Sequence, residues 1–109
     1  MEGRNTMLID FNTIQRLSLP DDLIGQMYND DHYRIIKTAI RPGGHIAVHR
    51  QDSGDDMNYI ISGTGVAICD DVEEELNPGV MHICPQGSKY SILNTGDTDL
   101  EMLTIVVKR

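Results

Sequence analysis

Residues 43–63 read GGHIAVHRQDSGDDMNYIISG, and the fold of this chain is predicted from this stretch. Apolar and polar residues alternate with a period of two on both sides of a polar loop, which is typical of short, half-buried strands. Gly43 and Gly63 stand at its two ends. Glycine adopts positive φ without steric cost, so both favour sharp turns. The stretch therefore predicts two strands, Ile46–Arg50 and Asn58–Ser62, joined by a polar loop.

The rest of the chain shows the same period of two, in short runs broken by Gly, Pro, Asn and Asp. Asp70-Asp71 predicts a tight hairpin turn because Asp tolerates left-handed backbone. Leu17–Tyr28, which contains Pro20 and Asp21-Asp22, is expected to hold at most a helical turn. This spacing favours an all-β sandwich or closed jelly roll. The other predicted strands are Met7–Ile9, Arg34–Ile40, Gly65–Cys69, Val72–Leu76, Val80–Cys84, Lys89–Leu93 and Leu100–Val107.

Two motifs in this pattern resemble those of small single-domain cupins, the cupin-2 conserved barrel family. The first cupin motif is Gly, five residues, His, one, His, three or four, Glu, six, Gly. In this chain its positions are taken by Gly43, His49, Gln51, Asp56 and Gly63. The second motif is Gly, five residues, Pro, one, Gly, two, His, three, Asn. Its positions are taken by Gly79, Pro85, Gly87, Tyr90 and Asn94.

The resemblance implies an all-β cupin jelly-roll β-barrel over residues 34–109. It also implies that residues 1–33 form an N-terminal segment that pairs with a dimer partner, so a homodimer is expected. At 109 residues the chain is long enough for one domain and its own core.

The same resemblance implies a metal site inside the barrel, where cupins with His, His, Glu and His hold a transition ion. Here the candidate ligands are His49, Gln51, Asp56 and Tyr90, so three of the four positions are altered. His82 is a possible substitute for the lost histidine, and Asn58, His82 and Cys84 are candidate pocket residues by strand alternation. Zn, Fe, Mn or Ni is the expected ion if one binds. The alternative, which we prefer, is a polar network in which these side chains pair with one another.

Three functional interpretations stay open from the sequence. The first is a cupin whose polar pocket binds a small polar molecule or, weakly, a metal ion. The second is a metal-dependent isomerase, lyase or dioxygenase acting on a small sugar, sugar acid or organic acid, with Tyr90 as candidate general acid or base. The third is a dimeric sensor or interaction module. Whether the protein is an enzyme is therefore left open.

Composition and charge indicate which classes of partner are excluded and which cell compartment is expected. The net charge of −8 argues against nucleic acid and against anionic membrane surfaces, which attract basic proteins. No run approaches the roughly 18 apolar residues that a membrane span needs, and the N-terminus lacks the apolar core of a secretory signal. A cytoplasmic location is expected. Cys69 and Cys84 are expected to be free thiols in or near the core.

Overall fold

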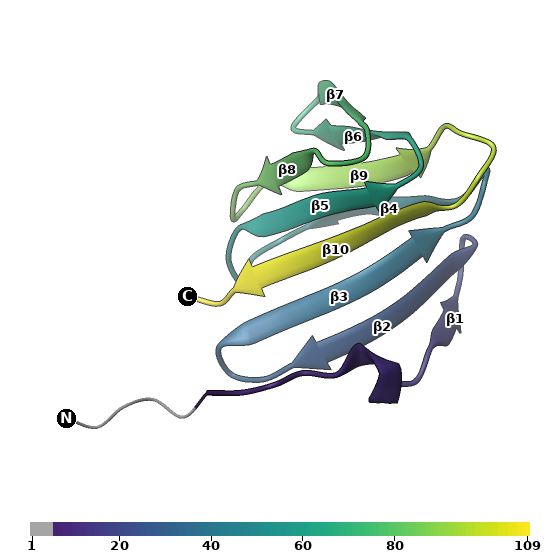
Figure 1. The fold of residues 1–109 in the computed structure, drawn as a ribbon. Helices are drawn as coiled ribbons and strands as arrows, with labels where there is room; N and C mark the ends of the chain where they lie inside the picture. The colour runs from purple at the N-terminus through teal and green to yellow at the C-terminus, as the bar shows by residue number, and fades with distance from the viewer. Residues whose placement is uncertain (1–5) are drawn as a thin grey trace.

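The computed structural model describes residues 6–109, which fold into two facing antiparallel sheets (Figure 1). The six-stranded sheet has the order β1-β2-β3-β10-β5-β8, and the four-stranded sheet has the order β4-β9-β6-β7. The bounds are β1 Leu17–Leu19, β2 Leu23–Asn29, β3 Tyr33–Ile40, β4 His45–Arg50, β5 Asp56–Ser62, β6 Gly65–Cys69, β7 Val72–Leu76, β8 Met81–Cys84, β9 Lys89–Asn94 and β10 Leu100–Val107. The predicted all-β jelly roll is confirmed.

From residue 33 onward, every predicted strand is present, with ends that differ by two residues at most. Two expectations nearer the N-terminus are wrong. Met7–Ile9 is not a strand, and the only helical turn in residues 6–109 is a 3-10 turn at Phe11–Thr13, where the Asp10 side chain accepts from the Asn12 N–H at 3.0 Å. Leu17–Tyr28 holds no helical turn and instead contains β1 and most of β2.

The β1–β2 hairpin turns at Asp21 and Asp22, whose φ angles are 67° and 61°. Asp70 and Asp71, between β6 and β7, have φ angles of 47° and 69°, as their predicted hairpin turn requires. Two successive residues at positive φ match the right-handed twist of the flanking strands, which is why short hairpins use such turns.

The β1–β2 hairpin extends the sheet of its own chain, because β2 pairs with β3 from Leu23↔Ile40 to Asn29↔Arg34. β1 and β2 of the predicted N-terminal segment therefore lie at one edge of the six-stranded sheet, while residues 1–5 of that segment lie outside the described part. No helix within residues 6–109 is long and apolar enough to cross a membrane.

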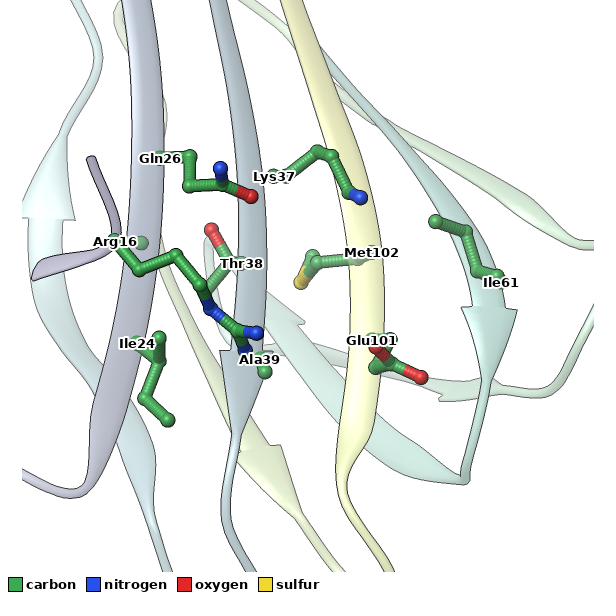
Figure 2. Close-up of a pocket in the computed structure, with 10 residues that line it drawn as sticks. Arg16, Ile24, Gln26, Lys37, Thr38, Ala39, Ile61, Glu101 and Met102 are labelled. Atoms are coloured by element: carbon green, nitrogen blue, oxygen red, sulfur yellow. The ribbon is translucent and has the colours of Figure 1, made fainter. Parts of the chain in front are cut away.

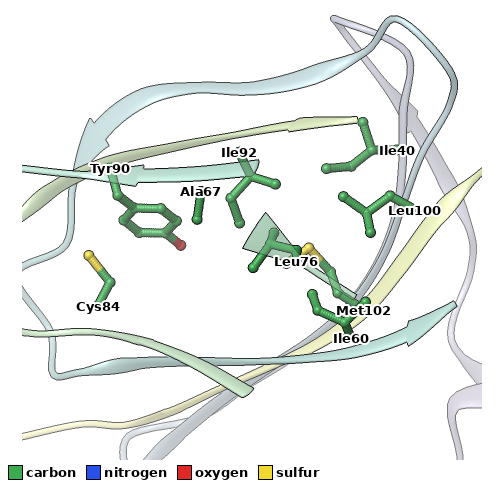
Figure 3. Close-up of a cluster of buried hydrophobic side chains, with 9 residues drawn as sticks. All are labelled: Ile40, Ile60, Ala67, Leu76, Cys84, Tyr90, Ile92, Leu100 and Met102. Atoms are coloured by element: carbon green, nitrogen blue, oxygen red, sulfur yellow. The ribbon is translucent and has the colours of Figure 1, made fainter. Parts of the chain in front are cut away.

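The core between the sheets is apolar at one end and polar at the other. Figure 3 shows Ile40 and Leu100 at one end of the buried cluster and Tyr90 and Cys84 at the opposite end. Alternation along the strands explains this division. β9 buries Tyr90 and Ile92, and β5 buries Asp56 and Ile60, so each strand carries a polar group at one end and an apolar group towards the other. The polar end holds the candidate site.

Candidate functional site

A cavity of about 480 Å³ lies between the sheets at their polar end. All four candidate ligands border it, although they come from different elements: His49 from β4, Gln51 just after β4, Asp56 from β5 and Tyr90 from β9. Its size is within the usual range for small-molecule sites. Other residues on its wall include Arg34, Thr38, Arg50, Ser53, Thr104 and Val106.

Asp56 and Tyr90 form a hydrogen bond across the gap between the two sheets. The Tyr90 hydroxyl donates to Asp56 Oδ2, and the two residues are only 2% and 4% exposed. Burial raises the pKa of Tyr90, and the hydrogen bond to Asp56 raises it further. Tyr90 is therefore a neutral phenol at physiological pH, which suits it to donate a hydrogen bond and not to act as a phenolate.

His49 lies directly against Tyr90. The two residues are partners in the β4–β9 ladder, and their ring centroids are 4.4 Å apart. A bulge in β4 between Ile46 and His49 lets both residues face inward, although they are three positions apart. His49 Nδ1 is 3.0 Å from the Ala47 carbonyl oxygen, which leaves Nε2 as the ring nitrogen free to contact a ligand.

Gln51 is held in place by the backbone around it. Its Oε1 accepts from the Ser53 N–H at 2.8 Å, while its own backbone pairs with Ser88 and Gly87. The amide oxygen, which would be its ligand atom for a metal, is thus already used in closing the loop after β4.

These four residues do not fit a divalent transition ion. His49 offers one imidazole nitrogen, the Gln51 oxygen is engaged, one Asp56 oxygen accepts from Tyr90, and Tyr90 stays protonated. Sites for Zn or Fe use several imidazoles, thiolates or carboxylates together. Within residues 6–109 no three His, Cys, Asp or Glu side chains are placed to hold one ion. We therefore assign no chemical step to a metal in this chain.

Asn58, His82 and Cys84 are buried on the inner face, but the cavity wall does not include them. Asn58 accepts from the Thr104 hydroxyl at 2.7 Å and is the cross-strand partner of His82. His82 Nε2 lies 3.6 Å from a Glu74 carboxylate oxygen, and His82 borders a separate hollow of about 240 Å³. The structure thus brings His49, Gln51, Asp56 and Tyr90 together and places His82 on another side.

Arg34 was not among the residues predicted from the sequence. It stands on β3 at the cavity wall, half-buried, and within residues 6–109 its guanidinium has no hydrogen-bond or ion-pair partner. Strand alternation could have found it, because Arg34 shares a face with Ile36 and with the fully buried Ile40.

A smaller hollow of about 170 Å³ lies on the other side of the six-stranded sheet (Figure 2). Figure 2 shows the Arg16 side chain reaching toward β3, which also carries Lys37, with Glu101 on the neighbouring strand β10. This hollow contains none of the predicted site residues, and the Glu101 carboxylate already accepts from Ser62. The cavity between the sheets is therefore the better candidate site.

Comparison with known proteins gives a match to the family model described as the cupin domain, over residues 37–106. The oxalate-binding protein of Thermotoga maritima is 30% identical over 71 residues, which cover 65% of this chain. The chain spans only 59% of the length of that relative.

Among solved structures, a predicted oxalate decarboxylase from Thermotoga maritima has a TM-score of 0.84 at 20% identity, covering 94% of this chain and 100% of that one. The Schizosaccharomyces pombe Cnp3 cupin domain has a TM-score of 0.80 at 13% identity, covering 92% and 72%. KdgF from Halomonas sp. has a TM-score of 0.79 at 11% identity, covering 90% and 91%. At these identities, the three structures establish the fold alone.

Proposed function

This chain belongs to the cupin family, and from that premise we propose that it binds a small organic acid whose carboxylate lies against Arg34. The observation that carries this proposal is the half-buried Arg34 guanidinium on the cavity wall, which has no partner among residues 6–109. A planar guanidinium matches a carboxylate with two parallel hydrogen bonds, and a half-buried arginine gains by taking such a partner.

The rest of the cavity supports the same class of ligand. His49 borders the cavity from the four-stranded sheet, and Thr38 adds a hydroxyl from the six-stranded sheet. The relative from Thermotoga maritima is named for binding oxalate, a small dicarboxylate. Asp52 and Asp56 also border the cavity, so a ligand with several negative charges would meet repulsion there. A small mono- or dicarboxylate fits these groups best.

The Arg34→Gln variant is expected to bind such an acid about 30-fold more weakly, which corresponds to roughly 2 kcal/mol for loss of a charged contact. Calorimetric titration with oxalate, malonate and lactate, and with uncharged glycerol for comparison, measures the change. Arg16→Gln is the matched control, because it makes the same charge change in the outer hollow of Figure 2.

Equal binding of glycerol and the acids would contradict the proposal. Loss of affinity in Arg16→Gln but not in Arg34→Gln would show that the acid binds in the outer hollow instead. The acids are expected to bind with the same affinity after dialysis against a chelator, because no metal is needed to hold the carboxylate. Loss of binding on chelation would instead favour a metal-dependent cupin.

We also propose that the protein is a homodimer. The resemblance implies an interface through residues 1–33, whereas the exposed apolar side chains favour the outer face of β10, β5 and β8 instead. Ile61, Ile83 and Val107 are 47%, 53% and 50% exposed on this face. Two copies that each carry a net charge of −8 repel one another, so a face with few carboxylates is where they can meet. Exposed apolar patches of this kind mark association surfaces.

Sedimentation equilibrium is expected to give twice the monomer mass for the native protein and the monomer mass for Ile83→Asp. Val48→Asp is the matched control, since Val48 is 70% exposed on β4 of the other sheet and the charge change is the same. A monomeric native protein, or a dimer that persists in Ile83→Asp and dissociates in Val48→Asp, would contradict this interface.

A further inference from the structure

Two cysteines meet across the gap between the sheets. Cys69 ends β6 in the four-stranded sheet, Cys84 ends β8 in the six-stranded sheet, and their sulfur atoms are 2.8 Å apart. Both are free thiols in the structure. A disulfide bond is about 2.05 Å long, so the sulfurs would have to approach by less than 1 Å to form one.

The thiol pair lies beside the hydrogen bond between Tyr90 and Asp56. Tyr90 is the cross-strand partner of Cys69, and Asp56 is the cross-strand partner of Cys84. The two inter-sheet contacts thus run side by side, one of them between oxygens and the other between sulfurs. The proposed ligand site makes no use of the thiols, because neither cysteine is on the cavity wall.

We propose that Cys69 and Cys84 are an oxidation site, at which a hydroperoxide converts the two thiols into one intramolecular disulfide between the sheets. Cys69 reacts first because it is half-buried, whereas Cys84 is fully buried. Burial, and then the contact with Cys69, also raises the pKa of Cys84 to about 12, so Cys84 holds its proton at neutral pH. Thiolate is the reactive form of cysteine, which makes Cys84 the slower of the two towards peroxide.

The steps balance with one molecule of hydrogen peroxide. The Cys69 sulfur attacks one peroxide oxygen, the O–O bond breaks, hydroxide leaves with the Cys69 proton as water, and Cys69 becomes a sulfenic acid. The Cys84 sulfur then attacks the Cys69 sulfur, the S–O bond breaks, and the hydroxyl leaves with the Cys84 proton as a second water. Two sulfurs are oxidised by one electron each, and the peroxide oxygens take up both electrons.

The disulfide would close the loop from Cys69 to Cys84, which contains β7 and most of β8. Cross-linking a loop of this length raises the melting temperature of a small domain by about 10 °C. The oxidised protein is therefore expected to melt about that much higher than the reduced protein, and dithiothreitol is expected to reverse the gain.

The test treats reduced native protein with one equivalent of hydrogen peroxide, then unfolds it and alkylates the remaining thiols. Mass spectrometry is expected to show a monomer that has lost two hydrogens and takes up no alkylating agent. Cys84→Ala is expected to stop at a sulfenic acid on Cys69, which dimedone captures. Cys69→Ala, the matched control, is expected to keep Cys84 reduced and alkylatable.

Three results would overturn the proposal. Native protein that keeps both thiols at peroxide levels that oxidise Cys69 in Cys84→Ala would show that the pair does not close. Native protein that gains oxygen at one cysteine would show overoxidation without a bond. A disulfide that links two copies of the chain would show that the oxidation is intermolecular and does not join Cys69 to Cys84 within one chain.

Discussion

Gly63→Ala is expected to lose about 4 kcal/mol of unfolding free energy, close to the whole stability of a marginal small domain. Gly63 has a φ of +84° in the turn after β5, a conformation that costs a residue with a Cβ roughly 1–3 kcal/mol. An added Cβ would also lie 2.3 Å from the Asp99 carbonyl oxygen and 2.8 Å from Leu100 Cα. Those atoms are backbone, so relieving the contact would have to move the start of β10.

Gly79→Ala separates the two costs. Gly79 has a φ of +88°, but apart from its two chain neighbours no heavy atom of residues 6–109 lies within 4 Å of the position its Cβ would take. We expect this variant to lose only about 1–2 kcal/mol, from backbone conformation alone. Urea unfolding followed by circular dichroism measures both proteins. Equal losses in Gly63→Ala and Gly79→Ala would mean that the close approach to Asp99 costs nothing.

Much of the fold could be predicted because the turns carry local signals. Gly43 and Gly63 were expected at sharp turns, and both have positive φ, as do Gly79 and Gly87 of the second motif. The Asp70-Asp71 hairpin was expected on the same kind of argument. The turns at these positions depend on each residue's own backbone preference, so they can be predicted from a single sequence.

The β1–β2 hairpin carries the same signal and was missed. Asp21-Asp22 is the same dipeptide as Asp70-Asp71 and adopts the same left-handed turn. Pro20 just before it favoured a helical turn instead. Gln26 is half-buried, and its side-chain amide donates to the carbonyl oxygens of Phe11 and Ile14, at 2.7 and 2.8 Å. Those partners are set by tertiary structure, which local patterns do not contain.

The candidate site could be predicted in outline for a similar reason. Motif spacing predicted that His49, Gln51, Asp56 and Tyr90 lie close together, and all four border one cavity. It could not show that the Ser53 N–H occupies the Gln51 oxygen, because that contact depends on how the loop after β4 closes. Arg34 lies outside both motifs, so attention to the motifs alone passes over the group that distinguishes the cavity.

The Tyr90→Phe variant is expected to lose about 3 kcal/mol of unfolding free energy at pH 7. Asp56 has one oxygen, Oδ1, that lacks a hydrogen-bond partner among residues 6–109, and Oδ2 accepts from Tyr90. Removing the phenol hydroxyl would leave a carboxylate that is 2% exposed and has no hydrogen-bond donor to either oxygen among residues 6–109. Leaving a buried hydrogen-bond acceptor without its donor costs roughly 1–3 kcal/mol, and more for a charged group, so we take about 3 kcal/mol.

The double variant Tyr90→Phe/Asp56→Asn tests whether the loss comes from the stranded charge. Asp56→Asn alone is expected to cost about 1 kcal/mol, because the amide oxygen can still accept from Tyr90. In the Tyr90→Phe background the same change removes the unpaired charge, so it is expected to restore stability. A change at Asp56 that costs the same in both backgrounds would show that the two side chains do not interact.

The pH dependence gives a second measure of the same hydrogen bond. Because the pKa of Tyr90 is raised on folding, the folded protein keeps a proton that the unfolded chain releases above about pH 10. The contribution is fully present below pH 10 and is lost as the pH rises, by up to roughly 1.4 kcal/mol for each pH unit. Cys84, whose pKa is raised to about 12, adds a similar loss of stability from about pH 9.

Urea unfolding between pH 8 and 11, about the range in which the unfolded groups titrate, measures this loss. The unfolding free energy of Tyr90→Phe is expected to fall less steeply with pH than that of the native protein, because the Tyr90 contribution is removed and the Cys84 contribution remains. Identical slopes in the two proteins would mean that folding does not raise the pKa of Tyr90, and this would contradict its buried hydrogen bond to Asp56.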